Sequence, residues 1–205
     1  MRELDLSGNI ANEDDNYFSY SIPLKLQALH VNNVNWEIKP LKYFIEVCSN
    51  SNLTSLSINH VQFIDSVKSK EKWNFLFSNL PARLNSVKTF SWNSNEIHHK
   101  FMTFLIDSQY LSSVSLNCCN CSNLIDIKRL LIQSRGIKQI SIQNIASDKK
   151  DVYLSDFKNF LREIPQMKYL QQIDLSHNYF DDECLEILKE SLINSNINFI
   201  AFDDS

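Results

Sequence analysis

Residues 170–178 read LQQIDLSHN, and the first nine residues of the chain, MRELDLSGN, follow the same pattern. In both stretches positions 1, 4 and 6 are apolar and position 9 is Asn. The apolar part of this nine-residue frame recurs in six further stretches, which begin at residues 26, 53, 87, 111, 137 and 197. The starts are 25, 27, 34, 24, 26, 33 and 27 residues apart, an average of 28. Such regular self-similarity indicates a repeat architecture.

Each frame also predicts a short strand. Positions 4 and 6 alternate with positions 3, 5 and 7, and successive side chains of a strand point to opposite faces of a sheet. We therefore expect positions 4 and 6 to point into a core, while positions 3, 5 and 7 form the opposite face. The predicted inward residues are Leu4, Leu6, Leu29, Val31, Leu56, Ile58, Phe90, Trp92, Val114, Leu116, Ile140, Ile142, Ile173 and Leu175.

The segments between the frames have helical periodicity, with apolar residues every three or four positions. The predicted helices span residues 38–50, 97–109, 123–135, 154–164 and 181–195. Asp181 and Asp182 precede the last helix, where acidic caps suit the helix dipole. Ser155 is a candidate start for the helix before it.

The repeated pattern LxxLxLxxN resembles that of leucine-rich repeat proteins, and the resemblance covers the whole chain. Long helices and repeats of about 28 residues are similar to the ribonuclease-inhibitor-like subclass. The resemblance implies an α/β fold of about eight repeats. It would be a curved solenoid with a parallel β-sheet on the concave face and helices on the convex face.

Two stretches resemble a narrower group. The extended third repeat, residues 53–87, and LQQIDLSHNYFDDECLEILKESL, residues 170–192, are similar in layout to repeats of the CARMIL (capping-protein and myosin-I linker) family. This resemblance implies a role in cytoskeletal (actin) regulation.

Composition describes a soluble globular protein. Of 205 residues, 43% are hydrophobic and 21% charged, and the net charge is −4, which gives no reason to expect a nucleic-acid partner. No apolar run is long enough to insert into a membrane, and the start of the chain lacks the apolar region of a secretory signal. We therefore expect a cytoplasmic protein with reduced cysteines.

The arrangement of repeats suggests how the domain is bounded. We expect residues 1–205 to form a single leucine-rich-repeat solenoid domain. The first frame begins at residue 1 and the last ends at residue 205, with no capping segment at either end. Because a bare terminal repeat exposes its core, we expect the chain to be a segment of a longer protein or part of an assembly.

Three of the five cysteines lie within Cys-Cys-Asn-Cys at residues 118–121. Cys119 and Cys121 occupy frame positions 9 and 11, which hold core residues in other repeats, and Cys118 lies at the rim of the strand face. A zinc site needs four converging ligands, and this spacing offers no second pair. We therefore favour packing over a metal or redox centre, and expect free, buried thiols at Cys119 and Cys121. Cys48 and Cys184 should face inward from helices.

The sequence offers no converging catalytic groups. The five histidines lie in four repeats, with only His98 and His99 in the same one. Only two glycines are present, so no phosphate-binding glycine loop can form. Neither HExxH nor GxSxG occurs. We predict that the protein is not an enzyme and that it uses no cofactor, metal or small-molecule substrate.

Two lysine-bearing stretches, DSVKSKEKW (65–73) and ASDKKDVYL (146–154), account for the two longest repeats. Both are predicted to be insertions between strand and helix at the same edge. Their lysines are candidates for gripping an acidic partner, although internal pairing with neighbouring acids favours plain solvated loops. The candidate residues are Lys68, Lys70, Lys149 and Lys150.

The predicted strand face is small, polar and nearly uncharged in its middle, so electrostatic steering by it should be weak. Its candidate partner-binding residues are Asn59, Asn93 and Asn117. We predict a non-catalytic protein–protein interaction scaffold whose partner is another protein. The alternative is a structural subunit of a large assembly, such as a cytoskeletal or ciliary complex.

Overall fold

The computed structural model describes residues 2–11, 26–63, 69–80, 84–95, 97, 99–108, 110–119, 124–145 and 151–203. The chain divides into two compact units, Met1–Trp92 and Asn93–Ser205. The expectation of a single domain stays a prediction.

The first unit contains two parallel sheets. The strands β1 (Glu3–Asp5), β3 (Ala28–His30), β5 (Ser55–Ser57) and β7 (Thr89–Ser91) pair in that order. A smaller sheet follows at positions 10 and 11 of the first three frames, with β2 (Ile10–Ala11), β4 (Asn35–Trp36) and β6 (Gln62–Phe63). The helices α1 (Ile38–Asn50) and α2 (Ser69–Asn79) pack against each other.

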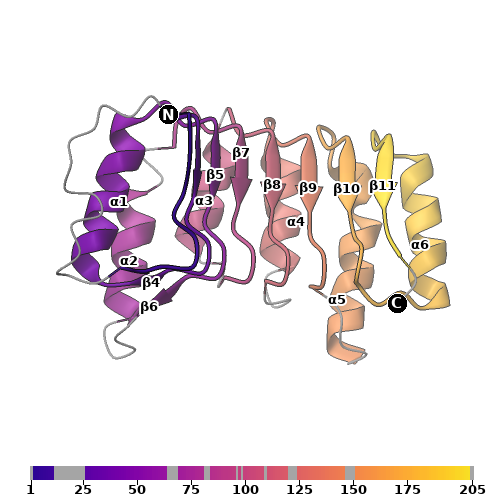
Figure 1. The fold of residues 1–205 in the computed structure, drawn as a ribbon. Coiled ribbons are helices and arrows are strands. Elements are labelled where there is room, and N and C mark those ends of the chain that lie inside the picture. The colour runs from indigo at the N-terminus through magenta and orange to yellow at the C-terminus, as the bar shows by residue number, and fades with distance from the viewer. Residues whose placement is uncertain are drawn as a thin grey trace. The chain divides into compact units, whose positions relative to one another are not determined.

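The second unit alternates strands and helices more regularly (Figure 1). Its strands β8 (Ser113–Ser115), β9 (Gln139–Ser141), β10 (Gln172–Asp174) and β11 (Phe199–Ala201) pair in parallel in chain order. The helices α3 (His99–Asp107), α4 (Leu124–Gln133), α5 (Asp151–Arg162) and α6 (Asp182–Ile193) each pack against the next. A short 3-10 helix, η3 (Ile164–Gln166), follows α5.

The predicted frames and the observed strands coincide. Each of the eight frames has its strand at positions 3–5, and neighbouring strands within a unit pair frame position to frame position, as in Ile140 opposite Ile173. This shared register places equivalent side chains beside one another on every strand. The predicted α/β leucine-rich-repeat fold, with parallel strands and intervening helices, is confirmed.

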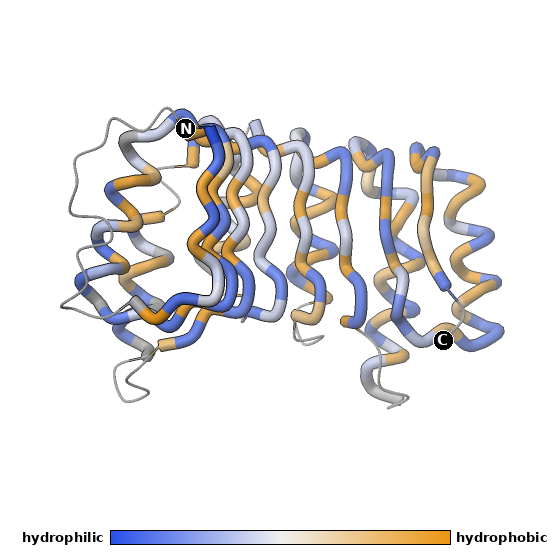
Figure 2. The backbone as a smooth tube through the Cα atoms, in the orientation of Figure 1, coloured by the Kyte–Doolittle hydropathy of each residue, from blue (hydrophilic) through white to orange (hydrophobic). Residues whose placement is uncertain are grey.

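The core lies between strands and helices. Twelve of the fourteen predicted inward side chains are buried, with hydrophobic residues recurring in short runs along the backbone (Figure 2). Leu4 and Leu6 are the exceptions, since both are only half-buried. Their strand, β1, pairs with β3 on one side, and no described strand pairs with its other side. Packing from that second side is what buries the equivalent residues of inner strands.

Part of each lysine-bearing stretch is helical, where the sequence predicted a loop. Residues 69–73 belong to α2, and residues 151–154 belong to α5, so Ser155 does not begin that helix. Lys72 and Leu76 of α2 and Leu80 just after it are buried at intervals of four residues, which is a helical periodicity that the lysines concealed. The predicted cap of α6 is confirmed, because the Asp181 carboxylate accepts a hydrogen bond from the Cys184 backbone N–H at 2.8 Å.

Frame position 8 has the same backbone conformation in every frame where the structure describes it. In seven frames this residue has φ between 52° and 77°, in the left-handed region that glycine tolerates best. Only one of the seven is glycine. The residues are Gly8, Asn33, His60, Ser94, Cys118, Asn144 and His177. Among the described turns, those with His, Ser or Cys at this position therefore store strain of about 1–2 kcal/mol, and asparagine tolerates the conformation better.

Candidate binding surfaces

Side chains on the strand face of the first unit are joined from repeat to repeat. The Asn32 side-chain carbonyl accepts hydrogen bonds from the Ser57 hydroxyl at 2.6 Å and from the Asn59 backbone N–H at 3.1 Å. One repeat further on, the Asn59 carbonyl accepts from the Ser91 hydroxyl at 2.8 Å. The side chain at position 7 of one frame thus accepts hydrogen bonds from residues at positions 5 and 7 of the next frame.

The second unit repeats the arrangement. The Asn93 side-chain carbonyl accepts from the Ser115 hydroxyl at 2.7 Å and from the Asn117 backbone N–H at 2.8 Å. The Asn117 carbonyl accepts from the Ser141 hydroxyl and the Gln143 backbone N–H, both at 2.8 Å. These asparagine–serine hydrogen bonds form a ladder across the strand face.

The three candidate asparagines are therefore rungs of this ladder. Asn59, Asn93 and Asn117 are half-buried on the strand face, and each offers its carbonyl to the following repeat. The amide group of Asn59 also donates to the Ser57 hydroxyl at 2.9 Å. A partner at this face must compete with bonds that the repeats already make, and partner binding by these residues stays a prediction.

The ladder of the second unit ends on a carboxylate. Asp174 accepts hydrogen bonds from the Gln143 amide at 2.5 Å, the Ser141 hydroxyl at 3.3 Å and the Ser176 backbone N–H at 3.0 Å. Partial burial by itself would raise the pKa of this carboxyl. The bonds from Ser176, Gln143 and Ser141 outweigh that effect, so the pKa of Asp174 is lowered and the group stays charged at neutral pH.

The candidate lysines lie largely beyond the part of the chain that the structure describes. Lys68, Lys149 and Lys150 are outside the described residues, and of Lys70 only the backbone, in the first turn of α2, is described. Lys72 of the same stretch is buried. Its ammonium donates to the Trp36 backbone carbonyl at 3.3 Å and lies 5.7 Å from the centre of the Phe63 ring. This lysine belongs to the core and does not extend toward a partner.

The cysteines follow the predicted register where they are described. Cys119 is buried and forms no disulfide, Cys118 is exposed at the rim, and Cys48 and Cys184 are buried on their helices. Burial raises the pKa of the Cys119 thiol to about 11, so this group is protonated at neutral pH. Cys121 lies outside the described residues.

The helix side of the second unit carries ion pairs that connect neighbouring helices. The Lys158 ammonium of α5 lies 2.7 Å from Asp181 Oδ2 and 2.6 Å from Glu183 Oε2, and Arg162 Nη2 lies 3.1 Å from Glu183 Oε1. Hydrogen bonds to Asp181 and Glu183 raise the pKa of Lys158. These charges link α5 to the start of α6.

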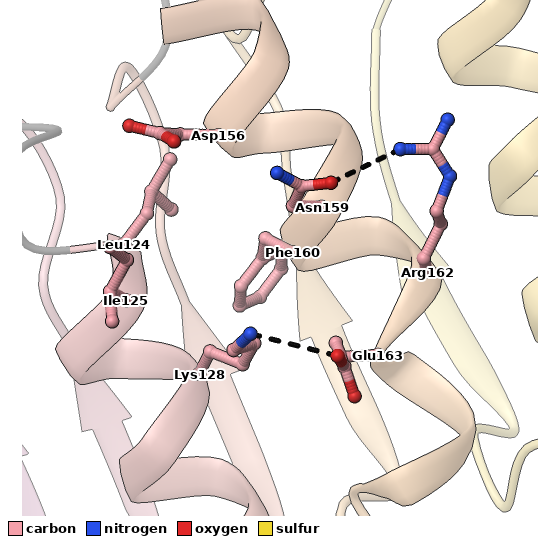
Figure 3. A pocket seen from close by; sticks show the side chains of 8 residues that line it. All are labelled: Leu124, Ile125, Lys128, Asp156, Asn159, Phe160, Arg162 and Glu163. Carbon is pink, nitrogen blue, oxygen red and sulfur yellow. Dashed lines mark hydrogen bonds and ion pairs between the residues drawn. The ribbon is translucent and has the colours of Figure 1, made fainter.

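A groove of about 260 Å³ lies between α4 and α5. Figure 3 shows the Phe160 ring in its middle, Asp156 beside Leu124 at one end, and the Lys128–Glu163 ion pair at the other. The Lys128 ammonium is 3.6 Å from Glu163 Oε1. The groove is lined by Leu124, Ile125, Lys128, Asp156, Asn159, Phe160, Arg162 and Glu163.

Sequence reasoning missed this groove, although a signal for part of it was present. Ile127, Leu130 and Leu131 of α4 are buried in the core, whereas Ile125 is 63% exposed and Ile132 is 36% exposed. Residues seven apart lie on the same side of a helix, so this second apolar stripe was visible beside the core stripe.

The described residues contain no group of three or more His, Cys, Asp or Glu side chains placed to hold a metal ion. None of the helices in this part of the chain is long and apolar enough to cross a membrane.

The chain is similar to solved structures, but no family model and no curated protein matches it. Among solved structures, Leiomodin-1 Actin-Binding Site 2 (ABS2) is similar over 58% of this chain and 74% of its own, with 14% identity and a TM-score of 0.41. The fold assignment rests on the strand registers of this chain.

Proposed function

We propose that this chain is a non-catalytic scaffold that binds another protein in the cytoplasm. The observation that carries the proposal is the common register of the strands within each unit. It sets equivalent polar side chains side by side at the strand spacing of about 4.8 Å, which builds an extended surface of the kind that repeat proteins use for binding.

Two sets of residues are proposed to contact the partner. On the strand face, the ladder engages the asparagine carbonyls, and the amides of Asn59 and Asn117 donate to Ser57 and Gln143. Asn59, Asn93 and Asn117 would therefore contact a partner in exchange for bonds that the repeats make. At the edge, Lys68, Lys70, Lys149 and Lys150 would pair with acidic groups of the partner.

The finer proposal is a role in actin regulation. Its support is the similarity in layout of residues 53–87 and 170–192 to repeats of the CARMIL family, within the ribonuclease-inhibitor-like subclass. The alternative is a structural subunit of a large assembly. Exposed Phe199 and Phe202, on and after β11, favour that alternative because a neighbouring subunit would cover them.

The experiment is affinity purification of the tagged chain from its native source, followed by mass spectrometry. We expect one dominant protein partner. Recovery of the chain alone, as a monomer that converts a small molecule, would overturn the proposal.

Variants then show which surface binds the partner. Asn117→Asp keeps an acceptor for Ser141 and Gln143 but removes the N–H donors, and the double variant Lys149→Glu/Lys150→Glu reverses the charge of the lysines in the second lysine-bearing stretch. Lys189→Glu, at an exposed position of α6, is the charge-reversal control for a surface outside both sets.

A further inference from the structure

The groove between α4 and α5 is lined by two acidic and two basic side chains, and three of these four already have charged partners. Lys128 is offset by Glu163, and Arg162 is held by Glu183 at 3.1 Å. Arg162 also donates to the Asn159 side-chain carbonyl at 3.2 Å. No described residue forms an ion pair with Asp156, which lines the groove. The groove therefore presents one carboxylate available to a cation.

The surface beside that carboxylate is apolar. Leu124 and Phe160 are buried at the base of the groove, and Ile125 stands exposed next to them. Ile132 lies two helical turns further along α4, about 10 Å away along the axis. The two isoleucines lie on one side of α4, with Lys128 and Arg129 at the positions between them. Exposed apolar side chains beside a groove are the kind of surface on which amphipathic helices dock.

We propose that this groove, together with Ile125 and Ile132, is the docking site for a basic amphipathic helix of the protein partner, with a lysine or arginine of that helix paired with Asp156. The inference rests on the proposed function, because it assumes that the chain binds a protein. It adds the surface and the chemistry of the bound segment.

Volume and charge favour a basic side chain as the occupant of the groove. At about 260 Å³ the groove is smaller than the 300–1,000 Å³ of typical small-molecule sites but has room for one long side chain. Lysine and arginine place an aliphatic stem on apolar surface and a charge at its end, which matches Phe160 and Ile125 beside Asp156. An acidic segment would instead have to displace Glu163 from Lys128 or Glu183 from Arg162.

The test uses two 14-residue helical peptides with identical apolar residues, one carrying a central lysine and the other a glutamate. Each is titrated into the ¹⁵N-labelled full chain. We expect the lysine peptide to shift the backbone amides of Ile125, Lys128 and Asn159, and to bind more tightly than the glutamate peptide. Asp156→Asn should weaken its binding about fivefold. Asp156→Lys should weaken it further.

The control is Glu186→Gln, which removes an exposed carboxylate of α6 that does not line the groove and should leave binding unchanged. Melting curves of the Asp156 variants show whether they remain folded. Equal binding of the two peptides, shifts outside the groove only, or unchanged binding by Asp156→Lys would overturn the inference.

Affinity purification with groove variants distinguishes a failure of this inference from a failure of the proposed function. If Asp156→Lys and Ile125→Ser retain the partner as well as the parent chain does, the groove is not its docking site, and the scaffold role stands. If the parent chain retains no partner, the proposed function fails and the inference fails with it.

Discussion

The strand face and the helix side of the second unit use polar side chains in opposite ways. On the strand face, Asn93 and Asn117 direct their carbonyls along the sheet to the next repeat. On the helix side, charged residues also connect neighbours, but Asp156 and the exposed Ile125 are left at the surface of a groove. The first arrangement stabilises stacking, whereas the second leaves groups available for a partner.

This difference separates folding from binding. Substitutions on the strand face should change the free energy of unfolding, and substitutions in the groove should change binding with little effect on stability. A chain in which both surfaces respond alike would remove the distinction.

The largest expected effect is in the core beneath the strand face. Leu116→Ala removes a fully buried side chain, so we expect unfolding in urea to become easier by about 2–5 kcal/mol. Ile125→Ala on the helix side should cost about 0.5 kcal/mol or less, because that side chain is mostly in water. Similar losses for both variants would show that the inward register is misassigned.

The ladder itself gives the next effect. Asn117→Ala leaves the Gln143 backbone N–H without its acceptor and the Ser141 hydroxyl with only Asp174 at 3.3 Å, which should lower the free energy of unfolding by about 1–3 kcal/mol. Asn117→Asp retains an acceptor oxygen and should lose less. Equal midpoints for Asn117→Ala and the parent chain in urea would mean that the ladder contributes nothing to stacking.

The strained turns at the rim of the strand face predict changes of about 1 kcal/mol in two directions. Cys118→Gly relieves a left-handed residue with φ 55° and should stabilise the chain, whereas Gly8→Ala introduces the same strain and should destabilise it. No atom lies within 4 Å of a methyl group added at Gly8, so the second effect isolates the backbone. Thermal melting measures both, and shifts of the same sign would contradict the explanation.

The helix-side ion pair should contribute less. A double-mutant cycle on Lys128 and Glu163 should give a coupling of about 0.2–1 kcal/mol, since both side chains are partly solvated and 3.6 Å apart. The coupling should shrink in 1 M salt. A coupling above that range that salt does not change would show that this ion pair stabilises the fold, as the ladder does.

The smallest effect concerns pH and the end of the ladder. Because the pKa of Asp174 is lower in the folded chain than its unfolded value of about 3.9, its contribution to stability is present above that value. The contribution is lost as the pH falls through the folded-state pKa. We expect Asp174→Asn to flatten the decline in stability between about pH 5 and pH 2. Parallel urea profiles for variant and parent would contradict this account.

Sequence alone predicted the strands because apolar alternation in the frames depends on burial, which is the strongest local signal. It failed at Leu4 and Leu6, since burial there depends on a neighbouring strand and not on the frame. It also failed at residues 69–73, where Lys72 is polar in type yet buried beside Trp36 and Phe63.

The surfaces were harder to predict than the strands. The asparagines of position 7 appeared in the sequence as an exposed polar row, but their hydrogen bonds to the next repeat depend on how strands align in space. The groove depends on the distance between α4 and α5, which no local pattern contains. Only the second apolar stripe, Ile125 and Ile132, was visible in the residues themselves.

The neighbouring thiols Cys118 and Cys119 differ in access to solvent, so the rates at which they are modified can report local opening of the native state. A thiol reagent should modify exposed Cys118 promptly, whereas Cys119 is covered and protonated and should react only when the turn after β8 opens. The lag between the two modifications on a single peptide, read by mass spectrometry, would report how often that repeat opens. Since the faster thiol supplies the reference, the measurement needs no engineered probe.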